Sequence, residues 1–398
     1  MTPKTFLFLS LTIIGVLLWL FFGGNISTQY PEVAELSEQD ATFDEYTEYF
    51  EALAEERGAE YAFEVLRRAQ LTPGTDLHLL AHVVGDILYK QEGIDGIHTC
   101  TPDFRNACSH SVVVGLFSER GIEALDDIAQ ACNEAPGGSG AYTMCFHGLG
   151  HGILAYANYD FEQAMSLCEK TGTPVRNHRE YIECVGGMTM EMISGVHDRN
   201  AWELARDDYF NEDNPLAPCN LPFVPEETRP ICYTYLTPHL FQVVGGNLGN
   251  PTTDIYEKAF SLCDRISEEE QQARDACYGG FGKEFVVLAE GRDVRDIGSS
   301  GEDTLRQVRY WCSLADDERG EIVCNGTALS SLFWGGENIP DASFLFCEIE
   351  DDQKLQTICY QDLTQMILFF LADSRHVEEL CRRLPEPHRN FCISNIKT

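Results

Sequence analysis

Positive charge is scarce in this sequence. Its 398 residues include 28 lysines and arginines against 64 aspartates and glutamates, which gives a formal net charge of -36. The phosphates of nucleic acids would repel so acidic a surface. We therefore expect no nucleic acid among the partners of this protein.

The signature motifs of several enzyme classes are also missing. The chain has no Gly-x4-Gly-Lys-Ser/Thr loop and no Gly-x-Gly-x-x-Gly after a strand pattern, so no nucleotide cofactor is expected. It has no Cys-x-x-Cys-His, so no covalently attached haem is expected. His-Glu-x-x-His, Gly-x-Ser-x-Gly and Cys-x-x-Cys are absent as well, and the sequence leaves open whether the protein is an enzyme.

Near the N-terminus, residues 5–22 form a long uncharged and mostly apolar run. As a helix this run would measure about 27 Å, close to the thickness of one bilayer core. Lys4 precedes it and acidic residues follow it, which predicts a cytoplasmic tip at residues 1–4, a transmembrane signal anchor at 5–22 and a body outside the cytoplasm. The alternative is a cleaved signal peptide, which also exports the body to a periplasmic, extracellular or lumenal space.

Residues 23–98 are expected to form a tether and a first helical segment. Residues 23–42 are acidic and lack apolar periodicity, which predicts a tether. Residues 43–70 fit two helices broken near Gly58, and a further helix is expected from Thr75 or Asp76 to about Gln91, within an N-terminal helical segment at 43–98.

The sixteen cysteines form a regular series over residues 99–398, and their even number in an exported chain indicates disulfide bonds. Neighbouring cysteines lie 8 to 16 residues apart, and the second cysteines of successive pairs lie 33 to 48 residues apart. The first cysteine of a pair often ends an amphipathic helical pattern, and the second begins an apolar one. The expected pairs are Cys100 with Cys108, Cys132 with Cys145, Cys168 with Cys184, Cys219 with Cys232, Cys263 with Cys277, Cys312 with Cys324, Cys347 with Cys359, and Cys381 with Cys392.

This period is typical of helical repeat proteins. We therefore predict an all-α fold, a right-handed αα-hairpin repeat solenoid with a disulfide across each hairpin. The architecture is similar to that of secreted cysteine-rich, tetratricopeptide-like repeat proteins of bacteria, in which a disulfide also joins the two helices of each repeat. The chain lacks the regular cysteine gap of that family, and the resemblance implies no functional residue.

Histidines cluster in the N-terminal half, where two pairs lie four residues apart. His78, His82 and Asp86 share one face of the predicted helix, and His147 and His151 share one face of another. Imidazoles at this spacing can share a metal ion, and they suit zinc, iron or copper. Alternatively, His147 and His151 are core residues bonded to carbonyls or carboxylates. The alternative for His78, His82 and Asp86 is that they form an ordinary polar helix face that meets water. The predicted metal ligands are His78, His82, His110, His147 and His151, with Asp86 or Glu191 as carboxylates.

Isolated polar residues also recur at similar positions of the apolar helices. In a solenoid such positions form a row, so Glu191, His239 and Glu284 are expected to extend the histidines along one groove, or else to form hydrogen bonds between repeats. Five further histidines near turns are expected on the surface: His98, His178, His197, His376 and His388.

Two functional hypotheses follow. The first is a membrane-anchored extracytoplasmic helical-repeat protein with a histidine-rich metal site, with catalysis left open. The second is a scaffold without enzymatic activity whose groove binds a protein, peptide or glycan and whose histidines are structural. Aromatic residues along that groove would favour the second hypothesis, and Tyr233, Tyr235, Phe241 and Trp334 are the candidates.

Overall fold

The computed structural model describes residues 29–101, 103–135, 138–210, 213–246, 252–295, 297–335, 339–371 and 373–396. Within these ranges the regular structure is helical and no strand occurs, which confirms the predicted all-α class. None of the helices in these ranges combines the length and the apolar character needed to span a membrane. The predicted tip and anchor, residues 1–22, lie outside the described part of the chain.

The N-terminal segment begins with α3 (Pro31–Leu36), α4 (Phe43–Arg57) and α5 (Ala59–Arg68). A capping box starts α4, because the Thr42 side chain accepts from the Glu45 N–H while the Glu45 carboxylate accepts from the Thr42 N–H. The predicted break between α4 and α5 is confirmed at Gly58, whose φ is 97°. The prediction of a tether over residues 23–42 was wrong in part, since α3 forms there and buries Leu36 against the helices that follow.

Helix α6 (Leu77–Glu92) confirms the predicted boundaries, and Asp76 caps it by accepting from the Leu79 N–H. Two 3₁₀ helices, η1 (Gly93–His98) and η2 (Asp103–Asn106), connect it to α7 (Ala107–Arg120). Within η2, Phe104 and Arg105 have positive φ angles of 53° and 56°. This left-handed turn brings the Phe104 carbonyl to the His78 ring.

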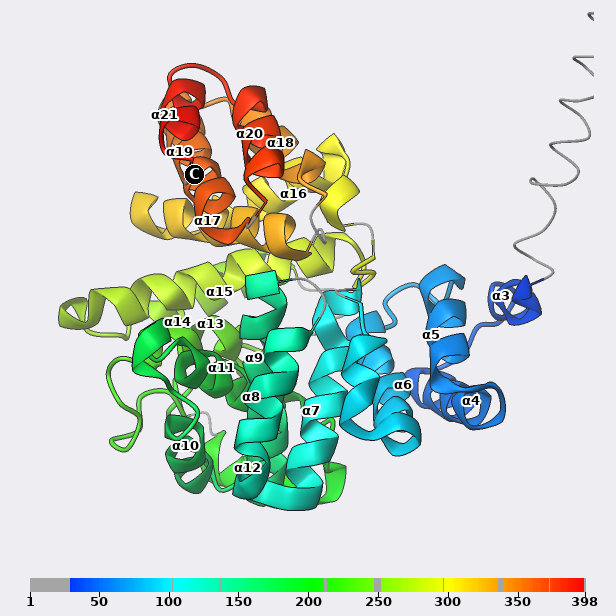
Figure 1. The fold of residues 1–398 in the computed structure, drawn as a ribbon. Helices are drawn as coiled ribbons and strands as arrows, with labels where there is room; N and C mark the ends of the chain where they lie inside the picture. Colours follow the sequence, from blue (N-terminus) through cyan, green and yellow to red (C-terminus); the bar gives the residue numbers. More distant parts are fainter. Residues whose placement is uncertain are drawn as a thin grey trace, which may run out of the picture.

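Most of the remaining chain consists of paired helices joined by short turns (Figure 1). The first cysteine of each pair lies in the first helix and the second cysteine in the second helix. The pairs are α8 (Leu125–Glu134) with α9 (Gly138–Tyr156), α10 (Phe161–Glu169) with α11 (Arg179–Ser194), α14 (Thr253–Cys263) with α15 (Gln271–Ala289), α16 (Glu302–Cys312) with α17 (Glu318–Gly335), α18 (Asp341–Glu348) with α19 (Gln353–Phe370), and α20 (Ser374–Arg383) with α21 (His388–Ser394). Short 3₁₀ helices precede or join these pairs: η3 (Gly121–Ala124), η4 (Pro174–Arg176), η5 (Glu268–Glu270) and η6 (Ile297–Ser299).

All eight predicted disulfides are confirmed. Their Cα–Cα distances lie between 5.4 and 5.7 Å, the usual range for an unstrained bridge. A chain with this many internal disulfides is typical of an oxidising, extracytoplasmic environment.

Two of the stapled units depart from the hairpin pattern. Cys100 follows η1 rather than a full helix. Cys219 lies in the irregular stretch 213–228, which precedes α13 (Arg229–Val243), and α12 (Arg199–Tyr209) is inserted before it. This insertion accounts for the longest spacing in the cysteine series, 48 residues between Cys184 and Cys232.

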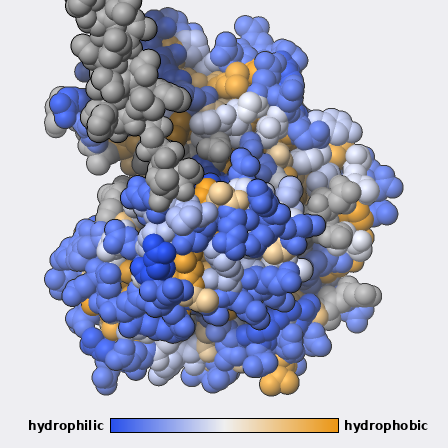
Figure 2. Space-filling model, turned by 90° about the vertical axis from the view of Figure 1, so that its right-hand side faces the viewer, coloured by the Kyte–Doolittle hydropathy of each residue, from blue (hydrophilic) through white to orange (hydrophobic). Residues whose placement is uncertain are grey.

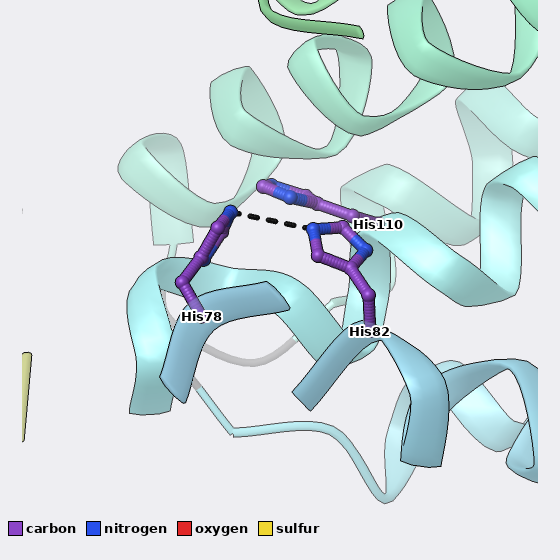
Figure 3. Close-up of side chains that lie close together, drawn as sticks. All are labelled: His78, His82 and His110. Carbon is purple, nitrogen blue, oxygen red and sulfur yellow. Dashed lines mark hydrogen bonds between the residues drawn. The ribbon is translucent and has the colours of Figure 1, made fainter. Parts of the chain in front are cut away.

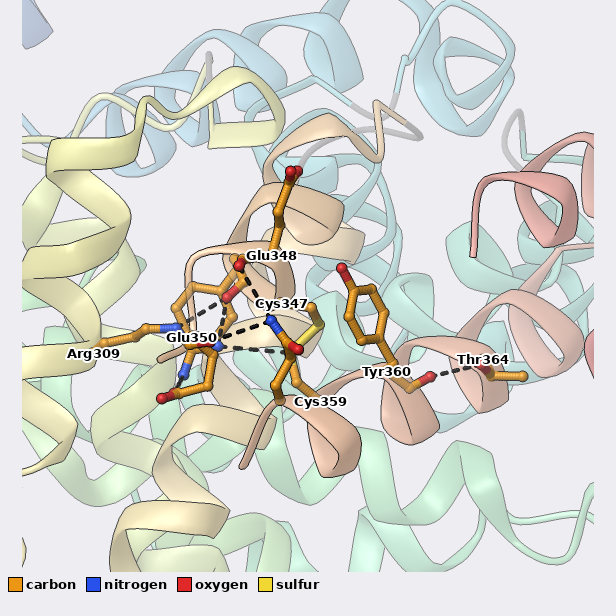
Figure 4. The surroundings of a disulfide bond; sticks show 9 residues. Arg309, Cys347, Glu348, Glu350, Cys359, Tyr360 and Thr364 are labelled. Atoms are coloured by element: carbon orange, nitrogen blue, oxygen red, sulfur yellow. Dashed lines mark hydrogen bonds and ion pairs between the residues drawn. A yellow bond between two sulfur atoms is a disulfide. The ribbon is translucent and has the colours of Figure 1, made fainter. Parts of the chain in front are cut away.

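A further link between units surrounds the Cys347–Cys359 disulfide (Figure 4). Arg309 of α16 reaches the turn after α18, where its Nε donates to the Phe346 carbonyl at 2.9 Å and its guanidinium pairs with Glu350. The guanidinium also lies 4.0 Å from the centre of the Phe346 ring. Arg309 thus caps α18 from a neighbouring unit and joins the two units beside the disulfide.

The long second helices pack on one another in chain order, from α7 through α9, α11, α13 and α15 to α17. Close contact between α9 and α11 depends on glycine. A Cβ atom at Gly187 would lie 1.7 Å from the carbonyl oxygen of His147, and one at Gly150 would lie 2.0 Å from that of Cys184. These contacts bring the backbones of the two helices against each other.

The series of helices also curls back on its beginning. Arg292, just after α15, pairs with Asp76 at the start of α6 at 3.1 Å. Arg105 of η2 donates to the Ser331 hydroxyl of α17 at 2.8 Å. Figure 1 shows this closure, with the blue and cyan helices α6 and α7 approaching the yellow-green region that follows α15. Helix α6 packs against α4, α5 and α7, and its first turn also meets the chain that follows α15 through the Arg292–Asp76 pair.

The outer surface is largely hydrophilic (Figure 2), as the many charged residues of the sequence predict. The face in Figure 2 is mostly hydrophilic, with hydrophobic residues scattered between polar ones. Such scattered apolar residues are normal on a folded surface. The distinctive polar groups of this chain lie inside it, where the N-terminal helices meet.

Candidate metal centre

Six histidines converge where α6, α7, α9 and the end of α11 meet. Five of them are buried, with between 0 and 8% of each residue exposed. The sixth, His197, follows α11, and 6% of its side chain is exposed. The members of this histidine cluster are His78 and His82 on α6, His110 on α7, His147 and His151 on α9, and His197.

The rings form one continuous cluster. The centroid of His82 lies 4.8 Å from that of His78, 5.4 Å from that of His110 and 5.6 Å from those of both His151 and His197. His147 is 5.6 Å from His110 and 5.3 Å from His151. His82 therefore lies close to four of the other five rings.

The surroundings of His78 and His82 indicate which nitrogen of each ring carries the proton, and Figure 3 shows the two rings with their Nε2 atoms facing each other. His78 Nδ1 lies 2.7 Å from the Phe104 carbonyl, which can only accept, so Nδ1 is the protonated nitrogen. His82 Nδ1 lies 3.2 Å from the Ser111 hydroxyl, which in turn donates to the His82 carbonyl at 2.8 Å. A hydroxyl that donates to this carbonyl accepts from His82, which places the proton of His82 on Nδ1.

Both Nε2 atoms then carry lone pairs, and they face each other at 3.3 Å. Two neutral imidazoles in these tautomers cannot form a hydrogen bond with each other, and a cation between the nitrogens would replace their repulsion by attraction. Zinc binds histidine nitrogens at about 2.0–2.1 Å, so two ligands of a tetrahedral ion lie about 3.3 Å apart. The spacing of His78 and His82 fits a shared ion.

His110 completes the first group. One ligand atom from each of His78, His82 and His110 can be chosen so that all lie within 4.8 Å of one another. Among the described residues neither ring nitrogen of His110 has a hydrogen-bond partner, although the residue is fully buried. A buried polar group without a partner costs roughly 1–3 kcal/mol, which a bound ion would offset.

Glu191, His151 and His197 form a second group, whose ligand atoms also lie within 4.8 Å of one another. His151 Nδ1 lies 3.0 Å from Glu191 Oε2, and His197 Nε2 lies 4.0 Å from the same oxygen. The other oxygen, Oε1, accepts from the Tyr159 hydroxyl at 2.6 Å and from the His197 backbone N–H at 3.0 Å. These bonds connect α9, α11 and the loop that carries His197.

Burial favours the neutral form of five of the six histidines. It lowers the pKa of His82, His110, His147 and His151 well below the ordinary value, and neighbouring imidazoles lower each further. Burial also lowers the pKa of His78. A neutral imidazole is the form that binds metal.

Asp86, the predicted carboxylate on α6, lies outside both groups of ligand atoms. It interacts with the Ser111 hydroxyl, and burial raises the pKa of Asp86 to about 7. Since Ser111 also bonds His82, Asp86 is connected to the site through Ser111.

The predicted groove residues Glu191, His239 and Glu284 are all buried. Glu191 faces the histidine cluster, while Glu284 pairs with Lys283 at 2.6 Å. His239 stacks on Phe210 with ring centroids 4.2 Å apart, and burial lowers the pKa of His239 to about 4. The alternative of hydrogen bonds between repeats describes Glu191 better, since it joins α11 to α9.

The alternative that the polar stripe of α6 meets water does not hold for His78 and His82, which are buried, whereas Asp86 is partly exposed. The prediction of His197 as a surface residue was also wrong, because its side chain turns inward from the loop after α11. Nothing in its local sequence marks it, apart from its position shortly after the helix that carries Glu191. Of the other four, His98 and His178 are exposed and His376 and His388 are partly exposed.

Comparison with known proteins gives this chain no relative. Neither a protein-family model, nor a curated protein, nor a solved structure matches it. The buried histidine and glutamate groups could hold a metal ion, and the function rests on their geometry.

Proposed function

We propose that this protein binds a transition-metal ion through His78, His82 and His110. The observation that carries the proposal is the approach of the two buried Nε2 atoms to 3.3 Å, with each Nδ1 facing an oxygen. The unpartnered nitrogens of His110, judged over the described residues, support the same assignment.

Three neutral imidazoles suit zinc, copper or iron. A set of three histidines is also a known catalytic zinc arrangement, because it leaves a coordination position for water or substrate. An ion bound in this way supplies Lewis-acid chemistry if it is zinc, or electron transfer if it is copper or iron. The residues of the first group would hold and orient the ion.

We further propose that the ion is held outside the cytoplasm by a right-handed αα-repeat solenoid of tetratricopeptide-like architecture behind an N-terminal membrane anchor. The eight disulfides support the compartment, and the ordered packing of the second helices supports the repeat. The apolar run at residues 5–22 supports the anchor.

A scaffold function has less support. Two of the aromatic residues expected to line a binding groove, Tyr233 and Phe241, are buried in the core at 1% and 0% exposure. The histidines also exceed what a structural role requires, because several of their buried nitrogens bond to nothing in the described part of the chain.

Metal content tests the proposal directly. The full chain, produced in an oxidising compartment without a histidine tag, should retain zinc, iron or copper in elemental analysis. His82→Ala should reduce the affinity of the chelator-stripped protein for zinc by at least about 100-fold, since an effect of 10–100-fold is typical of outer-shell partners alone.

The matched control is His98→Ala, whose side chain is 54% exposed. It should leave metal content and affinity unchanged. A well-folded wild-type protein that binds no zinc, copper or iron even after loading would refute the proposal and leave the scaffold function.

A further inference from the structure

We propose that the protein holds a second metal ion, bound by His151, Glu191 and His197, so that the histidine cluster is a two-ion centre. This inference rests on the proposed function, because the second group lies beside the first. The two groups share no residue, and each is complete with three ligand atoms within 4.8 Å of one another.

Unpartnered nitrogens are the first line of support. His151 Nδ1 faces Glu191, and its buried Nε2 has no hydrogen-bond partner among the residues that the structure describes. His197 Nε2 is buried and unpartnered in the same sense, and its nearest carboxylate oxygen is 4.0 Å away. Neither nitrogen gains anything from its burial unless a ligand occupies the space it faces.

The carboxylate supplies the second line of support. Glu191 is fully buried, and within the described ranges no lysine or arginine forms an ion pair with it. A buried carboxylate costs free energy unless a cation compensates it. A divalent ion beside Oε2 would provide that charge, and Tyr159 together with the His197 N–H holds Oε1 in place.

The distances between the rings show that the two ligand groups lie next to each other. The His82 ring of the first group lies 5.6 Å from both His151 and His197, which are themselves 5.8 Å apart. Rings in different groups are thus as close as rings within one group. Adjacent ions of this kind act together in two-metal hydrolytic and redox sites.

The donor sets of the two groups differ, which makes the ions distinguishable. The first group offers three imidazole nitrogens, and the second offers two imidazoles and one carboxylate. Two histidines with one carboxylate occur in catalytic zinc sites and in non-haem iron(II) sites, and both kinds keep open positions. The second group should therefore accept zinc or ferrous iron.

Stoichiometry tests this inference on the full chain, stripped with a chelator and reloaded with zinc or cobalt(II). Wild type should bind two equivalents by elemental analysis, His82→Ala and His197→Asn one each, and the double variant none. Cobalt(II) absorption should show two components in wild type and a different single component in each variant.

His197→Asn is chosen because His197 lies in a loop and its backbone bond to Glu191 does not depend on the side chain. Circular dichroism and the disulfide count would verify the fold, and His178→Asn, an exposed position, is the control. Glu191→Gln keeps the shape of the side chain and should weaken only the second equivalent, by at least 10-fold.

Failure of the second ion is separable from failure of the first. One equivalent in wild type that persists in His197→Asn, or that is lost in both single variants, would overturn the two-ion centre and leave the proposed function standing. No bound metal at all would overturn both.

Discussion

At the scale of the residue, the decisive feature is the fixing of imidazole tautomers by oxygen acceptors. The Phe104 carbonyl faces Nδ1 of His78, and the Ser111 hydroxyl faces Nδ1 of His82. Partners of this kind orient metal-binding histidines and raise their basicity. A sequence pattern of paired histidines cannot supply this information, because the partners come from other helices.

Ser111→Ala tests the tautomer argument. Without the hydroxyl, His82 loses the acceptor that keeps its Nε2 unprotonated, so zinc affinity at the first group should fall about 10-fold. A competition titration with a chromophoric chelator measures this. Ser109→Ala is the control on the same helix, since the Ser109 hydroxyl donates to Asn106 instead. Equal affinities in Ser111→Ala and wild type would contradict the argument.

At the scale of the element, the site depends on how closely α9 and α11 approach. The contact passes through Gly187, which faces the backbone of His147 itself. The two helices thereby bring His151 within hydrogen-bonding distance of Glu191. Small residues in this contact act on the site through the distance between backbones.

Gly187→Ala should therefore damage both fold and site. The added Cβ would meet a carbonyl oxygen that cannot move without its helix, so the free energy of unfolding should fall by about 1–3 kcal/mol or more. Urea unfolding and zinc titration measure the two effects.

Gly326→Ala is the matched control in another second helix. The nearest atom to an added Cβ is a carboxylate oxygen of Asp362 at 3.4 Å. Because alanine favours helix over glycine, this variant should be unchanged or up to about 1 kcal/mol more stable. Equal destabilisation by both substitutions would refute the role of the close contact.

At the scale of the whole molecule, stapled units are joined in series and the early units also contact the later ones. The histidine cluster is formed by α6 and the first three disulfide-linked units, far along the chain from the last. Removing one disulfide should therefore affect the site only if that disulfide lies in a unit that contributes a histidine to the cluster.

Replacing Cys132 and Cys145 together by serine should lower both stability and zinc affinity. The bridge closes a span of 13 residues, worth about 3 kcal/mol, and Cys145 lies on α9, the helix that carries His151 of the second ligand group. The terminal bridge, Cys381 with Cys392, closes a similar span of 11 residues, and its removal should lower stability without lowering zinc affinity. Thermal unfolding and metal content measure both, and equal loss of metal in the two variants would contradict a local site.

The sequence by itself determined the helices, their stapling and much of the candidate site. Apolar periodicity, Gly58 and the Asp76 cap set helix boundaries, because these effects act within a few residues. The order of cysteines determined all eight bridges, since short spans close most readily. Spacing also identified five of the six clustered histidines.

Only the tertiary structure decided the surroundings of those histidines. His197 joins the cluster from a loop, and Asp86 falls outside the ligand groups, because both positions depend on how α11 and α7 pack against their neighbours. The closure between Arg292 and Asp76 likewise joins segments 216 residues apart. Local patterns act over a turn or two of helix, whereas a buried ligand set is assembled by contacts between distant segments, and no period in the sequence records them.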